Sequence, residues 1–127
     1  MPRFAILCSA ALALLVGACE KTLDAPTDRG VCWHLVEENG KPVKFNRLAS
    51  NQPDLEHCAA QLDLMRRSFN ALGVNQREVT GAYQGQFLFL QPEGVFTAEK
   101  VDGFRYPMMI RAPDGTLVVP GAVRQQQ

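Results

Sequence analysis

The first nineteen residues constrain this chain most, because they decide which part of it folds and in which compartment. Thirteen mostly apolar residues, Phe4 to Val16, follow the basic residue Arg3. Secretory signal peptides have a basic start, an apolar core of about 7–15 residues and small residues before the cleavage site. A membrane-spanning helix needs about 20 apolar residues, and this run meets Glu20 too early. We therefore predict a signal peptide over residues 1–18, rather than an uncleaved anchor or a buried helix.

The end of the apolar run, Val16-Gly17-Ala18-Cys19, resembles the lipobox of bacterial prolipoproteins. The resemblance covers residues 1–19 only, and Val16 and Gly17 depart from the commonest pattern. It implies cleavage before Cys19, a diacylglycerol thioether on that cysteine and an acylated amino terminus of the palmitate type. Glu20, where some bacteria use Asp as an inner-membrane retention signal, implies the periplasmic side of the outer membrane. The implied product is a lipoprotein of the cell envelope whose membrane anchor is acylated Cys19.

Size and charge describe one small domain. Without residues 1–18 the chain has 109 residues, with 12 Lys and Arg against 13 Asp and Glu. Arg66-Arg67 is the longest basic run, so we expect no nucleic-acid partner. Residues 19–30 are polar and contain Pro and Gly, which predicts a lipidated N-terminus and flexible tether. Residues 31–120 form the predicted domain, and residues 121–127 a disordered tail.

The cysteines predict a disulfide. Cys8 leaves with the signal peptide and Cys19 carries lipid, so Cys32 and Cys58 remain in an oxidising compartment. A histidine lies close to each of them, which raises the alternatives of a zinc site and of free thiols. The spacing matches no zinc signature, and adjacent side chains on a helix diverge by about 100°. We therefore predict a Cys32–Cys58 disulfide, no metal and no cofactor.

A hairpin is predicted at the start of the domain. Residues 31–37 are apolar and β-prone, and Asn39-Gly40 is a strong signal for a type I′ turn before residues 41–46. Trp33 and Leu35 then face away from the core. The two-residue turn pairs Val36 with Val43 and His34 with Phe45, and the inner face carries Cys32, His34, Val36, Val43 and Phe45.

A helix is predicted between Pro53, which suits a first turn, and Gly73, which suits a C-cap. Asp63 and Arg67, four residues apart, are expected to form a pair on its solvated face. Apolar residues recur at helical spacing in one stripe that contains Leu55, Cys58, Ala59, Leu62, Met65, Phe69 and Leu72. Cys58 therefore points toward the inner face of the hairpin, where Cys32 lies.

The second half is predicted to be β-structure after a loop over residues 74–85. Strands are expected at 86–91, 94–100, 104–111 and 116–119, joined in part by turns at Pro92-Glu93 and Ala112–Gly115. Alternation over 104–111 predicts Phe104, Tyr106, Met108 and Ile110 inward, with Arg105 and Arg111 outward. The expected fold class is α+β with the order ββ-α-ββββ: one amphipathic helix packed on antiparallel hairpins and stapled by the disulfide.

No catalytic signature is present, so we predict that the protein is not an enzyme. The serines of the mature chain, Ser50 and Ser68, lie outside any G-x-S-x-G motif, and a disulfide removes the thiolate that a cysteine nucleophile needs. The first functional hypothesis is an accessory module that binds an envelope protein. Its contact patch would contain Trp33 and Leu35, provided that no second layer covers them.

The second hypothesis is a ligand-binding module, or a small envelope enzyme, that uses a cleft between the first hairpin and a second sheet. The predicted cleft residues are His34, Tyr83 and Arg105. A deep pocket with convergent polar groups would favour this hypothesis, whereas a flat apolar patch centred on Trp33 would favour the first.

Overall fold

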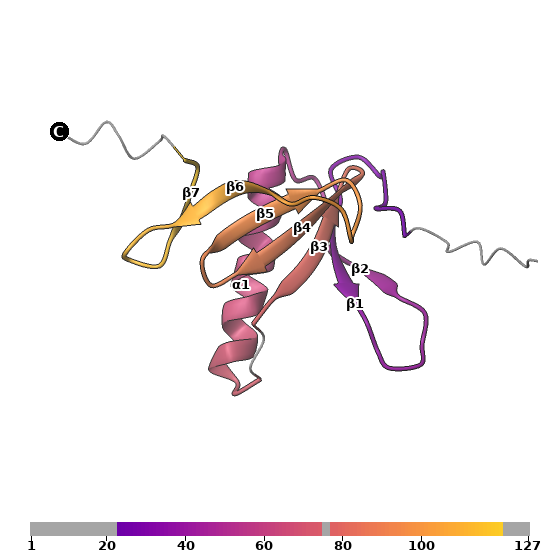
Figure 1. Ribbon diagram of the computed structural model, residues 1–127, viewed down its shortest axis with the longest axis horizontal. Helices are drawn as coiled ribbons and strands as arrows, with labels where there is room; N and C mark the ends of the chain where they lie inside the picture. The colour runs from indigo at the N-terminus through magenta and orange to yellow at the C-terminus, as the bar shows by residue number, and fades with distance from the viewer. Residues whose placement is uncertain (1–22, 75–76, 121–127) are drawn as a thin grey trace, which may run out of the picture.

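The computed structural model describes residues 23–74 and 77–120, which form one helix packed on one open antiparallel sheet (Figure 1). The α+β class is confirmed. The predicted signal peptide, Cys19 and the tail over residues 121–127 lie outside the described residues. Among those that are described, no helix is long and apolar enough to cross a membrane. The elements are β1 (Cys32–Val36), β2 (Lys44–Ala49), α1 (Leu55–Ala71), β3 (Val79–Tyr83), β4 (Gln86–Gln91), β5 (Gly94–Ala98), β6 (Tyr106–Arg111) and β7 (Leu117–Val118).

The sheet has the strand order β2-β1-β3-β4-β5-β6-β7, with one strand more than predicted. The prediction of a loop over residues 74–85 is wrong, because β3 lies there, between β1 and β4. Its Gly81 and Ala82 are residue types that are depleted in strands. Glycine is needed at 81 because a Cβ there would collide with Leu62 of α1 and with the Trp33 carbonyl oxygen. The close approach of α1 explains why this strand lacks the usual pattern.

The first hairpin forms, but its predicted register is wrong by one residue. Leu35 pairs with Phe45, and Val36 with Lys44. Lys41 N–H closes the turn on the Glu38 carbonyl oxygen at 3.0 Å. Gly40 has a φ of 77°, whereas Asn39 is not among the described non-glycine residues with positive φ, so this is not a type I′ turn. The slip moves Val43 and Phe45 away from the face of Cys32 and onto that of Leu35.

The helix begins after Asp54, the N-cap, whose carboxylate accepts a hydrogen bond from His57 N–H at 2.8 Å. Pro53 therefore precedes α1 instead of occupying its first turn. Gly73 follows the C-cap with a φ of 81°, as a helix-ending glycine does. Leu72 is 80% exposed, so the predicted apolar stripe ends before it.

The face of the sheet beneath α1, which we call the helix face, holds the larger core cluster. The disulfide is confirmed and joins β1 to α1 through Cys32 and Cys58, whose Cα atoms lie 5.2 Å apart. In Figure 1, the first part of α1 lies behind the sheet, and its last turns extend beyond the edge of the strands. The buried members of the cluster are Cys32, Cys58, Ala59, Leu62, Val79, Tyr83, Leu88, Leu90, Val95 and Met109.

Asp63 is buried in this core, so its predicted place on the solvated face is wrong. Only 2% of the residue is exposed, and Arg111 Nη2 donates to its Oδ1 at 2.8 Å. Arg67, the predicted partner, lies 3.3 Å from Oδ2 but is itself largely exposed. Arg111 also donates to backbone carbonyls of the two neighbouring turns, at Gln91, Pro92 and Gly115. One buried ion pair therefore connects α1 with both turns.

The predicted alternation in β6 is also wrong. Met109 is buried and Arg111 faces α1, whereas the side chains predicted inward are exposed or only partly buried: Phe104, Tyr106, Met108 and Ile110. The pairing of β5 with β6 shifts register between Val95 and Phe96. Such an irregularity changes which residues face the core, and the sequence alternation does not reveal it.

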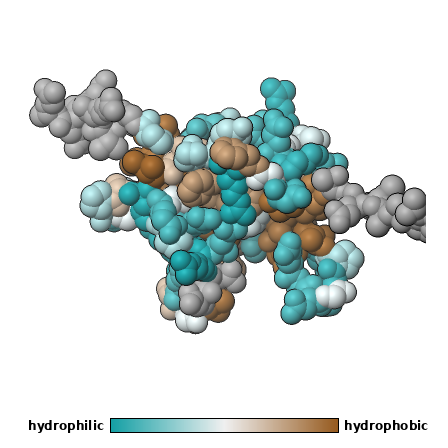
Figure 2. Space-filling view, in the orientation of Figure 1, coloured by the Kyte–Doolittle hydropathy of each residue, from teal (hydrophilic) through white to brown (hydrophobic). Residues whose placement is uncertain are grey.

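The opposite face of the sheet, which we call the far face, is covered by chain segments instead of a helix. Ala25 from the segment before β1 and Val101 from the β5–β6 loop pack there. Lys100 Nζ lies 2.6 Å from Asp24 Oδ1 and ties the two segments together. Figure 2 shows hydrophobic residues gathered beside the N-terminal segment on the right. The buried residues are Ala25, Leu35, Ala82, Phe87, Phe89 and Ala98.

Candidate ligand-binding cleft

A cleft opens where β1 and β3 separate, and its apolar lining comes mainly from the far face. Their pairing ends at His34 and Gly81, although β1 continues through Leu35–Val36 and β3 has Val79–Thr80 beyond this point. The facing edges of these residues lack a strand partner, and the two strands diverge in Figure 1. A cavity of about 350 Å³ lies here. It is lined by His34, Leu35, Glu37, Glu78, Val79, Thr80, Phe89, Val101 and Arg105.

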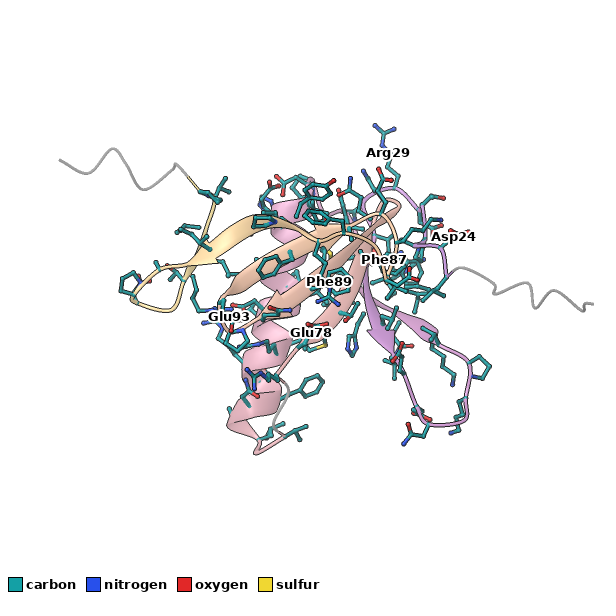
Figure 3. The ribbon with its side chains drawn as sticks, in the orientation of Figure 1. Asp24, Arg29, Glu78, Phe87, Phe89 and Glu93 are labelled. Carbon is teal, nitrogen blue, oxygen red and sulfur yellow. A yellow bond between two sulfur atoms is a disulfide. The ribbon has the colours of Figure 1, made fainter. Side chains whose placement is uncertain are left out.

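Arg105 is the most constrained polar group of the cleft. Its guanidinium carbon lies 3.6 Å from the centroid of the Phe89 ring, and its Nη1 donates to Glu78 Oε2 at 3.1 Å. Glu78 Oε2 also accepts from Gln91 Nε2 at 2.7 Å. Figure 3 shows Glu78 and Phe89 at neighbouring positions on the sheet. Stacking and the ion pair together hold the planar guanidinium in one orientation.

His34 is the second polar group predicted for the cleft. Partial burial removes water from the imidazole and lowers its pKa below the usual value. The ring is therefore neutral at pH 7, with one nitrogen that donates and one that accepts hydrogen bonds. On the side toward α1 the ring lies 6.4 Å from Phe69, measured between centroids.

Two of the three predicted cleft residues, His34 and Arg105, line the same cavity. Tyr83 does not: it is 5% exposed on the helix face, and its hydroxyl donates to the Gln52 carbonyl oxygen at 2.7 Å. The predicted second sheet is also absent from the described residues, because all seven strands belong to one sheet. Glu78 and Phe89 were missed, since recognising them requires β3, the strand whose pattern was not detected.

Trp33 and Leu35 point away from α1, as the sequence predicted, but they do not form an open patch. Leu35 is 8% exposed and Trp33 is partly buried, both within the far-face cluster. Arg47 covers the Trp33 ring from 5.5 Å. The segment before β1 supplies the covering layer that the sequence left open as an alternative.

The chemistry of the cleft suits binding. Its apolar floor contains Leu35, Phe89 and Val101, and charged groups of both signs surround it. No cysteine, serine or lysine occurs among the lining residues, and Thr80 supplies the only hydroxyl. Across the described part of the chain, no three His, Cys, Asp or Glu side chains are grouped to hold a metal ion.

The chain was compared with protein-family models, with curated proteins and with solved structures. None of these comparisons gave a match.

Proposed function

We propose that this protein is a lipoprotein of the bacterial envelope that acts, without catalysis, as a tethered binding module. The anchor is acylated Cys19 at the periplasmic side of the outer membrane. Three features support export: the apolar leader, the lipobox-like end of that leader, and a disulfide of the kind that persists in oxidising compartments. Two or more acyl chains make such an anchor stable, because each buried CH₂ contributes about 0.8 kcal/mol.

The cleft between β1 and β3 is the observation that carries the binding role. One donor nitrogen of Arg105 is used by Glu78, and among residues 23–74 and 77–120 no hydrogen bond involves its Nη2 or Nε. A planar guanidinium with free donors recognises a carboxylate. Ligand pockets typically measure about 300–1,000 Å³, so the cleft, at about 350 Å³, takes a compact group.

The end of a polypeptide chain is the ligand class that fits best. It joins a carboxylate to an extended backbone and an apolar or neutral side chain. The carboxylate would bind Arg105, the last side chain would pack on Leu35 and Val101, and the backbone would pair with the open edge of β1 or β3. An envelope protein that presents such a chain end is the proposed partner. Tethering both partners to one envelope raises their effective concentration.

Binding is tested with short peptides that end in an apolar residue, each prepared as the free acid and as the amide. Chemical shifts of the full-length protein should move for Leu35, Thr80 and Phe89 with the acid, and at least about tenfold more weakly with the amide. Arg105→Gln should abolish this preference. Arg47→Gln is the matched control, because Arg47 also lies over an aromatic ring but outside the cleft. Equal binding of acid and amide, or no shift in the cleft, would contradict the proposed ligand.

The anchor is tested separately by the intact mass of protein purified from membranes, with and without reduction and alkylation. The expected mass is that of cleavage before Cys19 plus acyl chains, with two further cysteines alkylated only after reduction. An unacylated mass would refute the lipid anchor while leaving the cleft intact.

A further inference from the structure

We infer that the chain end bound in the cleft carries a cationic residue two positions before its terminal residue, and that Glu37 selects it. This inference rests on the proposed function and names a second side chain of the ligand that the cleft recognises. Glu37 directly follows β1 and lines the same cavity as Arg105. In the part of the chain that the structure describes, its carboxylate forms no hydrogen bond or ion pair.

The strand register places Glu37 across the split from Glu78. β1 and β3 are paired up to His34 and Gly81, and residue numbers rise along β1 as they fall along β3. Continued past this last pair, the same register sets Glu37 level with Glu78. Both residues line the cleft. Two carboxylates therefore flank it where the strands diverge toward the β1–β2 turn (Figure 1).

The two carboxylates differ in what neutralises them. Glu78 Oε2 accepts from Arg105 Nη1 at 3.1 Å and from Gln91 Nε2 at 2.7 Å. The carboxylate of Glu37 has no such donor, and the imidazole of His34 is neutral at pH 7 because burial lowers its pKa. The lining therefore holds two negative charges against one positive charge. A ligand with a carboxylate alone would add to this excess, whereas a cation beside Glu37 would cancel it.

The same register fixes which end of the ligand lies deeper in the cleft. Thr80 pairs with Phe89 and, by the continued β1–β3 register, is level with Leu35. The guanidinium of Arg105 lies over the Phe89 ring in this row. The terminal carboxylate bound by Arg105 therefore lies level with Leu35, and the preceding residues of the ligand extend toward Glu37.

The spacing of Leu35 and Glu37 fits an extended ligand. The two residues are two positions apart, and alternate residues of a strand share one face. Two residues of extended chain span about 7 Å. A ligand paired antiparallel with the open edge of β1 would set its last side chain beside Leu35 and the side chain two residues earlier beside Glu37. The residue between them points to the opposite face of the ligand strand.

The test uses free-acid peptides that end in valine and carry lysine, glutamine or glutamate two residues before the end. An exposed ion pair contributes modestly, so the lysine peptide should bind the full-length protein about threefold more tightly than the glutamine peptide. The glutamate peptide should bind more weakly still, and added salt should reduce these differences. Lysine placed next to the last residue should give no gain, because its side chain would point away from Glu37.

Substitutions at two neighbouring glutamates separate the role of Glu37 from the overall charge of the protein. Glu37→Gln should remove the preference for lysine, and Glu37→Lys should reverse it, so that the glutamate peptide binds best. Glu38→Gln is the matched control and should keep the preference. Glu38 is also exposed, but it pairs with Lys41 at 2.8 Å and is not among the residues that line the cleft.

The outcomes distinguish failure of this inference from failure of the proposed ligand. Equal affinities of the three peptides, with chemical shifts still moving in the cleft, would overturn the role of Glu37 and leave the chain-end ligand in place. A preference for lysine that survives Glu37→Gln, or that is as strong with lysine next to the last residue, would also overturn it. No shift at Leu35, Thr80 or Phe89 with any peptide would refute the proposed ligand itself.

Discussion

The two faces of the sheet are closed in different ways. On the helix face, α1 covers the core, and it is joined covalently to β1 through Cys32–Cys58 and by a buried ion pair to β6 through Asp63–Arg111. On the far face, the described chain has no helix over the aromatic residues, and the segment before β1 and the β5–β6 loop pack against them. The far face accordingly keeps open space, including the cleft between β1 and β3.

This difference indicates a division of roles. A helix with a continuous apolar stripe excludes water along its length, whereas single chain segments cover only what lies beneath them. We expect the helix face to provide most of the stability and the far face to provide the binding surface. The following predictions test that division, from the largest expected effect to the smallest.

Neutralising the buried carboxylate on the helix face should be the most damaging change. Asp63→Asn leaves Arg111 without its charge partner, and removing one member of a buried ion pair costs about 3–5 kcal/mol. Urea unfolding measures the loss. Glu56→Gln, an exposed carboxylate on the same helix, should change the free energy of unfolding by less than about 0.5 kcal/mol. Equal losses of unfolding free energy in the two variants would show that the Asp63–Arg111 ion pair stabilises the fold no more than an exposed carboxylate does.

Removing the disulfide should be next in size. The linked residues are 26 apart, and the chain-entropy treatment gives about 3.5 kcal/mol for a loop of this length. Thermal unfolding of the Cys32→Ala, Cys58→Ala double variant, compared with the oxidised protein, measures this contribution. Hydrogen exchange should show that amides of α1 lose protection before those of β4. Simultaneous loss in both elements would argue that the faces are not independent.

Comparable side-chain truncations on the two faces should differ by about 2 kcal/mol. Leu62→Ala creates a cavity under α1, which typically costs about 2–5 kcal/mol. Val101→Ala shortens a partly buried side chain in a loop, and we expect about 1 kcal/mol or less. The two variants are compared by the urea concentration at which each is half unfolded. A larger loss from Val101→Ala would reverse the proposed division between the faces.

The smallest expected effect is a pH dependence that arises from His34. Burial lowers its pKa in the folded state, so the unfolded state binds the proton more readily. The stabilising contribution is complete above the unfolded pKa of about 6.5 and declines as the pH falls below it. The charged groups that line the same cleft as His34 are Glu37, Glu78 and Arg105.

Urea unfolding just above and just below that pKa measures this effect. His34→Gln should flatten the decline between the two conditions, because the only other histidine, His57, is retained in both proteins. An unchanged slope in the variant would assign the pH dependence to another group.

Features that follow from local sequence patterns were predicted correctly. The helix followed from apolar spacing, with Gly73 just past its end. The β4–β5 hairpin followed from two apolar runs around Pro92-Glu93. The disulfide followed because the period of the strand and that of the helix each pointed one sulfur inward. In each case the information lies in the residue pattern of the individual elements concerned.

Features that depend on how elements meet were not predictable in this way. The predicted type I′ turn at Asn39-Gly40 did not form and the strands paired one residue out of the predicted register, and the phase of β6 changes at a shift between Val95 and Phe96. Asp63 is buried because Arg111, distant in sequence, reaches it. A carboxylate on a helix is usually exposed, and only a partner from another element reverses that preference.

The amino-acid sequence by itself determined the fold class, the helix, most of the strands and the pairing of the two core cysteines. Each of these follows from local periodicity, turn residues and the identity of neighbouring side chains. Only the tertiary structure decided where β3 lies, which charges are buried and where the cleft opens. The reason is physical: an apolar pattern specifies that a side chain is removed from water, but not which neighbour removes it. The cleft forms where β1 and β3 cease to be neighbours, so it depends on which elements pack together in the folded chain.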